Sequence, residues 1–445
     1  MNRRQLLKNA LWSVPGLLGG TFSLSSCGGN SANPGPGPGP GPGPTPQCSS
    51  ATHSMGLSFA SATRLNAIAP APIATQSGPV NLATYFSLDD VDLLSRMGYG
   101  ALLPPIGNQG QQGSCVAWGV GYAATSFFAR FGAANQFPPT STSAQASPAD
   151  LYAKLMQYER NICGNGTQIA DALDIAVVEG VANLATLPYS DQICSSPAAT
   201  SQFFLNGYTR LDPTNSTLLK QHLSNLSVIP IGITVFPDFE NASGSGVYSP
   251  SSANCSLGGH CIALVGYDDT RQAFRIMNSW GTGWGDNGFL WVSYKGFPSF
   301  VSEAFLPTGS FWPTPIQGAG GIIPGSLASN GPVSISGAVV FSWSAPDSNA
   351  STPYLAHINI ELDGPLHVSS VQIQYSDSNP ANTVSLGSYT IQQWSRTLIF
   401  QTPLTSAQAT TVFAGLGSVS IAISGASVSG QIEATSCQVR VGSLR

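Results

Sequence analysis

The chain has 445 residues, which is enough for two or three domains that each bury a core of their own. Charged residues make up 8% of the chain, well below the roughly 25% of an ordinary soluble domain. The net charge is -5 and the 16 Lys and Arg residues form no basic stripe, so the composition argues against nucleic acid as a partner.

Residues 1–26 resemble a twin-arginine, lipoprotein-type signal peptide. Arg3 and Arg4 precede an apolar run over residues 10–22 that is too short to span a bilayer. The run ends in Leu-Ser-Ser-Cys, which resembles a bacterial lipobox with Cys27 as the lipidated residue. We therefore expect an exported protein that a lipid anchor alone attaches to a membrane, facing the periplasm or the cell surface. The alternative is an ordinary signal peptide with an incidental cysteine.

The next two segments have the composition of connectors. Residues 27–47 contain the lipidation candidate and a Gly/Pro repeat that favours neither helix nor sheet, so they predict an extended linker. Residues 48–90 are rich in Ala, Ser and Thr with few periodic apolar positions. They predict a connector or a short pro-segment.

Residues 91–312 differ in character and predict a domain with helices first and strands second. Helices are expected over residues 115–131, where apolar residues lie on every side of the helix, from Ser147, and over residues 168–179 before Gly180. Strands are expected at residues 228–236, 260–267, 273–278 and 289–294. This order predicts an α+β fold with two lobes.

A second composition change follows this domain. Residues 313–325 predict a linker, and residues 326–445 contain no lysine and several β-rich segments separated by turn residues. Strands are expected at residues 338–343, 357–362, 368–375 and 388–400. We expect an all-β, sandwich-like domain of unknown role, and no catalytic constellation occurs in it.

The first chemical motif is Asn-Gln-Gly-Gln-Gln-Gly-Ser-Cys at residues 108–115. Cys115 follows a Gly-rich loop and begins the apolar helix. Backbone amides at a helix N-terminus favour a thiolate and lower the thiol pKa, so Cys115 is a candidate nucleophile. The side-chain amide of Gln109 can donate to an oxyanion beside the backbone amide of Cys115.

Two later motifs supply partners for this thiol. His260 follows two glycines at the start of an apolar strand, where its imidazole can take the thiol proton and protonate a leaving amine. Asn278 begins Asn-Ser-Trp-Gly, and its side chain can accept from the far ring nitrogen and fix the tautomer. Trp280 can cover that hydrogen bond and exclude water from it.

These three motifs, in this order, resemble those of the papain-like (C1) cysteine peptidases. Over residues 91–312 the resemblance implies a helical lobe, a β-barrel-like lobe and hydrolysis of peptide bonds through an acyl-thioester. It implies that Cys115 is the nucleophile, His260 the acid and base, Asn278 the residue that orients the ring, and Gln109 part of the oxyanion hole. The expected substrate is a peptide or protein, the expected state is a monomer, and no cofactor or metal is implied.

The resemblance has departures. Gln112 stands where the family usually has a cysteine, and Val116 replaces the usual tryptophan after the nucleophile. Gly166 stands where the family contacts the substrate backbone. Four further histidines have no motif around them and are predicted to be structural or exposed: His53, His222, His357 and His367.

The chain has eight cysteines, so a lipidated Cys27 leaves an odd number and at least one free thiol. Disulfides are expected in an exported protein. The resemblance implies a Cys163–Cys194 disulfide. Two weaker pairings are Cys255–Cys261 and Cys48–Cys437.

Two other functions stay open at this point. The same Cys–His pair can pass the acyl group to an amine, as in a transpeptidase or amide ligase. A surface binding or adhesion protein is the second alternative, with the C-terminal region as the binding part and a vestigial peptidase lobe.

Overall fold

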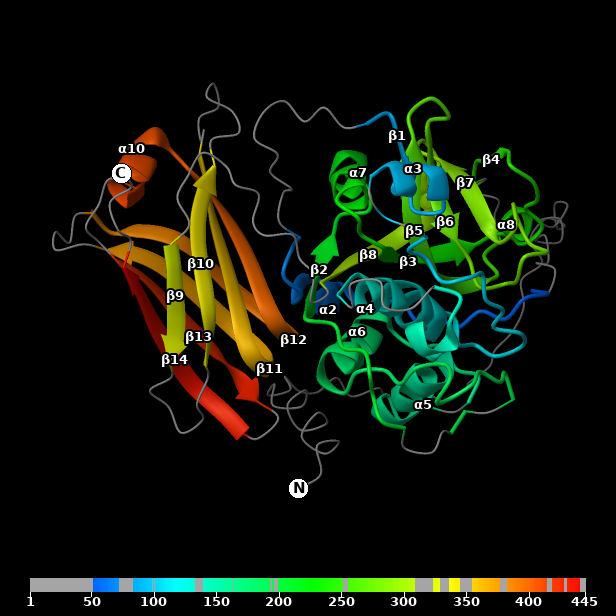
Figure 1. The fold of residues 1–445 in the computed structure, drawn as a ribbon, viewed down its shortest axis with the longest axis horizontal. Coiled ribbons are helices and arrows are strands. Elements are labelled where there is room, and N and C mark those ends of the chain that lie inside the picture. The colour runs from blue at the N-terminus through cyan, green and yellow to red at the C-terminus, as the bar shows by residue number, and fades with distance from the viewer. Residues whose placement is uncertain are drawn as a thin grey trace, which may run out of the picture.

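The computed structural model describes residues 51–71, 83–97, 99, 101–132, 139–161, 163–192, 194–195, 199–250, 255–308, 323–328, 336–344, 354–376, 382–413, 418–427 and 430–440. The predicted signal peptide, the lipidation candidate Cys27, the Gly/Pro linker and most of the linker at residues 313–325 lie outside the described residues. Figure 1 shows two domains side by side, one of mixed helices and strands and one of strands with a single helix.

The mixed domain begins with short elements and continues into a layer of helices. The elements are α2 (Ala62–Asn66), β1 (Tyr85–Ser87), α3 (Val91–Arg96), a π-helix (Ala117–Thr125), α4 (Ser126–Gly132), a 3-10 turn (Thr142–Ala144), α5 (Pro148–Tyr158) and α6 (Ile169–Val178). All nine residues of the π-helix are buried, which agrees with the apolar pattern predicted for this segment.

The predicted helix ends are confirmed. Ser147 caps α5 because its hydroxyl accepts from the amide of Asp150 at 3.3 Å, and Pro148 occupies the first turn, where its missing N–H costs nothing. Gly180, two residues after α6, has a φ of +68°, a conformation that favours glycine.

An eight-stranded sheet packs against these helices. Its strands are β2 (Gly207–Leu211), β3 (Ile229–Val235), β4 (Val247–Tyr248), β5 (Gly258–Asp268), β6 (Ala273–Met277), β7 (Phe289–Ser293) and β8 (Val301–Thr308), in the order β2-β8-β3-β5-β6-β7-β4, with β1 on β5. The four predicted strands are β3, β5, β6 and β7. Helices α7 (Ser216–Ser224), α8 (Pro237–Glu240) and α9 (Phe297–Phe300) connect the strands. The α+β prediction is confirmed.

One apolar core joins the helical layer to the sheet. It includes Val116, Val120 and Phe127 from the helical side and Ile262 and Leu264 from β5, all at most 1% exposed. Burying apolar surface of this size fixes the start of the π-helix against the middle of the sheet. The packing therefore sets the position of Cys115 relative to β5.

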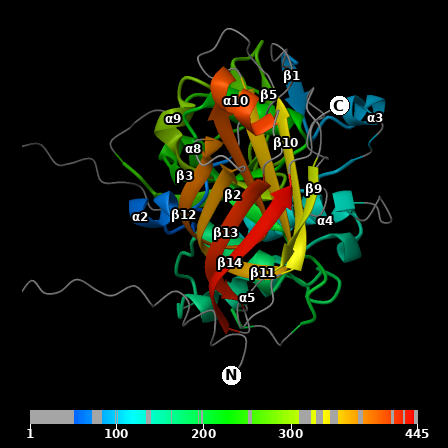
Figure 2. The ribbon, with the colours of Figure 1, turned by 90° about the vertical axis from the view of Figure 1, so that its left-hand side faces the viewer.

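The second domain contains β9 (Ile323–Ala328), β10 (Ser336–Ser344), β11 (Tyr354–Ser376), β12 (Val384–Leu404), α10 (Ser406–Phe413), β13 (Ser418–Ser427) and β14 (Gly430–Arg440). The described strands form one antiparallel six-stranded sheet, which lies in front of the mixed domain in Figure 2. The region is separate and β-rich, as predicted. The two strands predicted at residues 357–362 and 368–375 are one strand, because β11 keeps its pairing with β12 through the register shift between Glu361 and Leu366.

Strand β12 also contacts the mixed domain. The guanidinium of Arg396 donates from Nε to the carbonyl of Val177 in α6 at 3.2 Å. Gln393 donates from Nε2 to the carbonyl of Tyr208 in β2 at 2.7 Å. The indole of Trp394 is 1% exposed and belongs to the core of the mixed domain.

Among the described residues, no helix is both long enough and apolar enough to cross a membrane.

Candidate active site

Cys115 lies where the helical layer meets the sheet. Its side chain is buried, and its Sγ accepts a hydrogen bond from the backbone amide of Cys261 at 3.3 Å. Cys261 follows His260 on β5. The fold therefore brings the predicted nucleophile to the strand that carries the predicted base.

The ring of His260 is held by Asn278. The imidazole Nε2 and the Asn278 Oδ1 are 2.8 Å apart, and the same Oδ1 accepts from the amide of Ser279 at 2.8 Å. Because Oδ1 is an acceptor, Nε2 carries the ring proton and Nδ1 carries the lone pair. Nδ1 is buried and has no hydrogen-bond partner among the described residues. The tautomer predicted from the sequence follows from this geometry.

Trp280 covers this pair. Its indole stacks on the imidazole of His260 with ring centroids 4.5 Å apart and an interplanar angle of 25°. A second histidine, His53, stacks on the same indole at 4.4 Å and 13°. The indole thus separates the His260–Asn278 hydrogen bond from solvent, and such a bond is stronger where the surroundings are dry.

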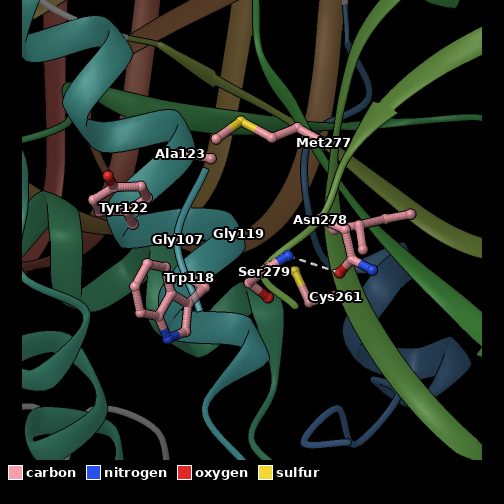
Figure 3. Close-up of a pocket in the computed structure, with 10 residues that line it drawn as sticks. Gly107, Trp118, Gly119, Tyr122, Ala123, Cys261, Met277, Asn278 and Ser279 are labelled. Atoms are coloured by element: carbon pink, nitrogen blue, oxygen red, sulfur yellow. Dashed lines mark hydrogen bonds between the residues drawn. The ribbon is translucent and has the colours of Figure 1, made fainter. Parts of the chain in front are cut away.

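A small cavity lies behind the site, between the π-helix and the sheet (Figure 3). Gly119 and Trp118 line it on the helical side, and Cys261, Asn278 and Ser279 line it on the other. A Cβ added to Gly119 would lie 2.6 Å from the Cys261 Sγ, so the Cys261 side chain points towards the helix. The dashed line in Figure 3 is the Ser279–Asn278 hydrogen bond.

Gln109 is fully buried, and all of its amide atoms are engaged. Its Nε2 donates to the carbonyl oxygen of Ser54 at 2.9 Å and to that of Gln112 at 3.0 Å, while its Oε1 accepts from the hydroxyl of Ser279 at 2.7 Å. The carbonyl oxygens of Ser54 and Gln112 can only accept, so they fix which end of the amide is the donor. Gln109 therefore presents an N–H to a carbonyl oxygen of the chain itself, and its part in an oxyanion hole stays a prediction.

The Ser54 carbonyl that accepts from Gln109 belongs to a segment that crosses the site. We call residues 52–60 the covering segment. Leu57 pairs with Gly259 of β5 on one side and with Thr167 on the other. The bonds are Leu57 N to Gly259 O at 3.1 Å, Ser58 N to Thr167 O at 3.0 Å and Thr167 N to Gly56 O at 2.9 Å. The covering segment is thus an extended strand between the two lobes.

Two carboxylates hold the covering segment near its ends. Glu240 Oε1 accepts from the amides of Thr52 at 2.6 Å and His53 at 2.7 Å. Glu303 Oε2 accepts from the amide of Ala60 at 3.3 Å, and burial raises the pKa of Glu303 to about 7. Sequence reasoning missed this crossing and predicted His53 to be structural or exposed, because no motif surrounds residues 52–60.

The covered site holds its thiol and imidazole in their neutral forms. Burial raises the pKa of Cys115 to about 12, although hydrogen bonds from the amides of Cys261, Val116 and Cys115 itself oppose the shift. Burial lowers the pKa of His260 to about 4, against the hydrogen bond with Asn278. The predicted low pKa of Cys115 is therefore wrong for this arrangement, because desolvation outweighs the amides at the helix start.

The remaining sequence predictions have mixed outcomes. The Cys163–Cys194 disulfide is confirmed, with Cα atoms 5.6 Å apart. The Cys255–Cys261 pairing is wrong, because Cys255 is in a disulfide and Cys261 is a buried free thiol that faces the π-helix. Cys48 lies outside the described residues, so its pairing with Cys437 stays a prediction.

Two residues singled out in the sequence lie beside the covering segment or the disulfide. A Cβ added to Gly166 would lie 2.8 Å from the Ser58 hydroxyl, so this glycine lets the covering segment approach. Gln112, which stands in place of a cysteine, has its Nε2 3.6 Å from the Sγ of Cys194.

In the described part of the chain, no group of three or more His, Cys, Asp or Glu side chains is placed to hold a metal ion.

The model of the papain family of cysteine proteases matches residues 90–300. These residues form a papain-family domain. Papain of Carica papaya is 28% identical over 47% of this chain and 56% of its own length. Gamete and mating-type specific protein A of Dictyostelium discoideum is 27% identical over 46% of this chain and 44% of its own length. The chain spans about half the length of the curated relatives it matches.

A solved structure of xylellain, a cysteine protease from Xylella fastidiosa, covers 60% of this chain and 99% of its own, with 20% identity and a TM-score of 0.46. The papain-family domain contains all four side chains predicted to carry the chemistry: Gln109, Cys115, His260 and Asn278.

Proposed function

We propose that the papain-family domain is a cysteine-type peptidase that hydrolyses peptide bonds with Cys115 and His260. The observation that carries the proposal is the arrangement at β5. The Cys115 thiol contacts the residue after His260, and Asn278 holds the His260 ring so that Nδ1 keeps its lone pair. A thiol that contacts the neighbour of a neutral imidazole of fixed tautomer supplies the two groups that nucleophilic catalysis needs.

In the first half of the reaction, the thiol proton of Cys115 moves to Nδ1 of His260 as Sγ attacks the carbonyl carbon of the scissile bond. Negative charge develops on the carbonyl oxygen, which the Nε2–H of Gln109 stabilises in the position where it now binds Ser54 O. The C–N bond then breaks. The imidazolium gives its proton to the leaving amine, and the acyl group remains on Sγ as a thioester.

In the second half, water replaces the amine. His260 takes a proton from the water as its oxygen attacks the thioester carbon, and the same proton returns to Sγ as the C–S bond breaks. Asn278 keeps the ring in one tautomer through both halves, and Trp280 limits access of water to that hydrogen bond. No redox step or cofactor enters this sequence.

A matched pair of variants tests this proposal. Cys115→Ala removes the proposed nucleophile, and Cys261→Ala removes the neighbouring buried thiol while keeping the backbone amide that faces Cys115. We expect Cys115→Ala to abolish hydrolysis of a labelled casein and Cys261→Ala to retain it. Hydrolysis by a folded Cys115→Ala protein at the unsubstituted rate would show that another group does the chemistry.

We propose that the substrate is a peptide or protein and that the chain works outside the cytoplasm, attached by lipid on Cys27. The Cys163–Cys194 disulfide supports an oxidising compartment. All four proposed side chains come from one chain, which supports action as a monomer. Mass spectrometry of the mature exported protein tests the anchor: we expect diacylglycerol on an N-terminal Cys27, and an unmodified cysteine or a cut elsewhere would contradict it.

A further inference from the structure

The covering segment fills the place that an extended substrate needs. Its backbone bonds to Gly259 and Thr167 use the edges of both lobes, and its Ser54 carbonyl occupies the amide of Gln109. The fit is tight at Gly56, where an added Cβ would lie 2.1 Å from the carbonyl oxygen of Gly113. A peptide cannot reach Cys115 while the covering segment is in this position.

Helix α2 follows the covering segment directly, with Ser61 as its N-cap. Arg64 of α2 reaches both domains. Its Nη2 is 2.6 Å from Asp174 Oδ2 in α6, and its Nη1 donates to the carbonyl of Gln392 in β12 at 2.5 Å. Asp174 is fully buried, so loss of this guanidinium would leave a carboxylate in the interior without its cation.

The residues after α2 make two more contacts with β12, and one of the two side chains involved also reaches β2. The amide of Gln392 donates to the carbonyl of Ala67 at 2.5 Å, and the amide of Ala69 donates to Oε1 of Gln393 at 2.9 Å. The other end of the Gln393 amide donates to Tyr208 O at 2.7 Å. Figure 1 shows α2 between the two domains, so the C-terminal domain lies against the chain that leads out of the cleft.

We propose that the C-terminal β domain regulates the peptidase by holding α2, and through it the covering segment, over Cys115. This inference rests on the proposed function of the site. Only residues 59–61 separate the last backbone pair of the covering segment from α2, so movement of α2 away from β12 pulls on the pairing at Leu57 and Ser58. Undocking of β12 from α2 is the step that opens the site.

A charge-conserving substitution tests the contact with the least disturbance. Arg64→Lys keeps a cation beside Asp174 and removes the bond to Gln392 of the C-terminal domain. We expect iodoacetamide to modify Cys115 about tenfold faster in this variant, the size expected when one buried hydrogen bond to a charged group is lost. Peptide mapping by mass spectrometry assigns the label to Cys115.

A second variant weakens the same docking by a substitution in the C-terminal domain. Gln393→Leu removes the bonds to Ala69 and Tyr208, and we expect it to speed modification of Cys115 to a similar degree. The control is Tyr389→Phe, also in β12, whose hydroxyl lies 3.5 Å from that of Thr402 in the same domain. It should leave the rate unchanged. Thermal unfolding shows which variants are folded.

The outcomes separate this inference from the proposed function. Faster modification in Arg64→Lys and Gln393→Leu, with Tyr389→Phe unchanged, supports the inference even if no variant cleaves a peptide, in which case the proposed function fails alone. Unchanged modification in folded Arg64→Lys and Gln393→Leu overturns the inference, and peptide cleavage by the same proteins would leave the proposed function intact.

Discussion

The two domains bury polar side chains in different places. In the papain-family domain, the buried polar side chains include Gln109, His260 and Asn278, which lie around the cleft and carry the proposed chemistry. In the described part of the C-terminal domain, the buried polar side chains are those of His367, Gln393 and Ser395. Gln393 and Ser395 bond to each other where β12 meets β2.

Buried polar groups are costly unless they are paired, so their location indicates where a domain needs specific contacts. In the papain-family domain these groups include those of the proposed reaction site, and in the C-terminal domain Gln393 and Ser395 lie at the docking surface. Substitutions in the first set should therefore change the chemistry. Substitutions in the second set should change access to it.

The largest effect is expected from His260→Ala. It removes the group that accepts the thiol proton, so hydrolysis should fall by at least about a thousandfold. Turnover of a fluorogenic peptide measures the loss. His222→Ala, at another buried histidine of the same domain, is the control and should keep activity wherever it stays folded.

Gln109→Ala should have the next largest effect. Removing one oxyanion donor typically lowers kcat by about 10²–10³. The variant also loses the bond to Ser54 O, so modification of Cys115 should become faster while turnover becomes slower. These opposite changes distinguish loss of chemistry from loss of access, and a kcat equal to that of the unsubstituted chain would remove Gln109 from the mechanism.

Gly56→Val tests access alone. The added side chain meets Gly113 O, and overpacking of this kind costs on the order of 1–3 kcal/mol, so the open fraction should rise about 5- to 150-fold. Peptide turnover should rise with it. Gly246→Val is the control, because no atom lies within 4 Å of the added Cβ there. Slower turnover in Gly56→Val would indicate that the covering segment supports the site instead of blocking it.

The smallest expected effect concerns acid stability, to which two buried histidines, one in each domain, should contribute unequally. Burial lowers the pKa of His260 from 6.5 to about 4, so its contribution to stability is present above pH 6.5 and is lost as pH falls from 6.5 to about 4. Burial also lowers the pKa of His367, but the charge of Asp174 opposes the shift. Urea unfolding between pH 7 and pH 4 should show that His260→Gln removes more of the acid sensitivity than His367→Gln does.

The catalytic part of this site could be predicted from the sequence because each motif is local. A Gly-rich loop followed by an apolar helix places Cys115 at a helix start, and an apolar strand fixes the position of His260. Asn278 follows β6, the neighbour of β5 in the sheet, so strand pairing alone brings its side chain near the ring. The fold class followed from the same periodicities.

The covering segment and the contacts that hold α2 could not be predicted in this way. Backbone hydrogen bonds to Gly259 and Thr167 need no particular side chains and leave no pattern in the sequence. The Arg64–Asp174 pair joins residues 110 positions apart, and composition does not specify such a pairing. The predicted low pKa of Cys115 failed because its burial depends on tertiary packing that the local motif does not specify.

The central claim is that Cys115 is a nucleophile that His260 activates once the covering segment leaves. The most direct test is labelling of the Gly56→Val chain with an epoxide inhibitor of thiol peptidases, with and without His260→Ala, followed by peptide mapping. The account predicts one adduct, on Cys115, that His260→Ala abolishes. An adduct on Cys261, or labelling of Cys115 that is as fast without His260, would contradict it.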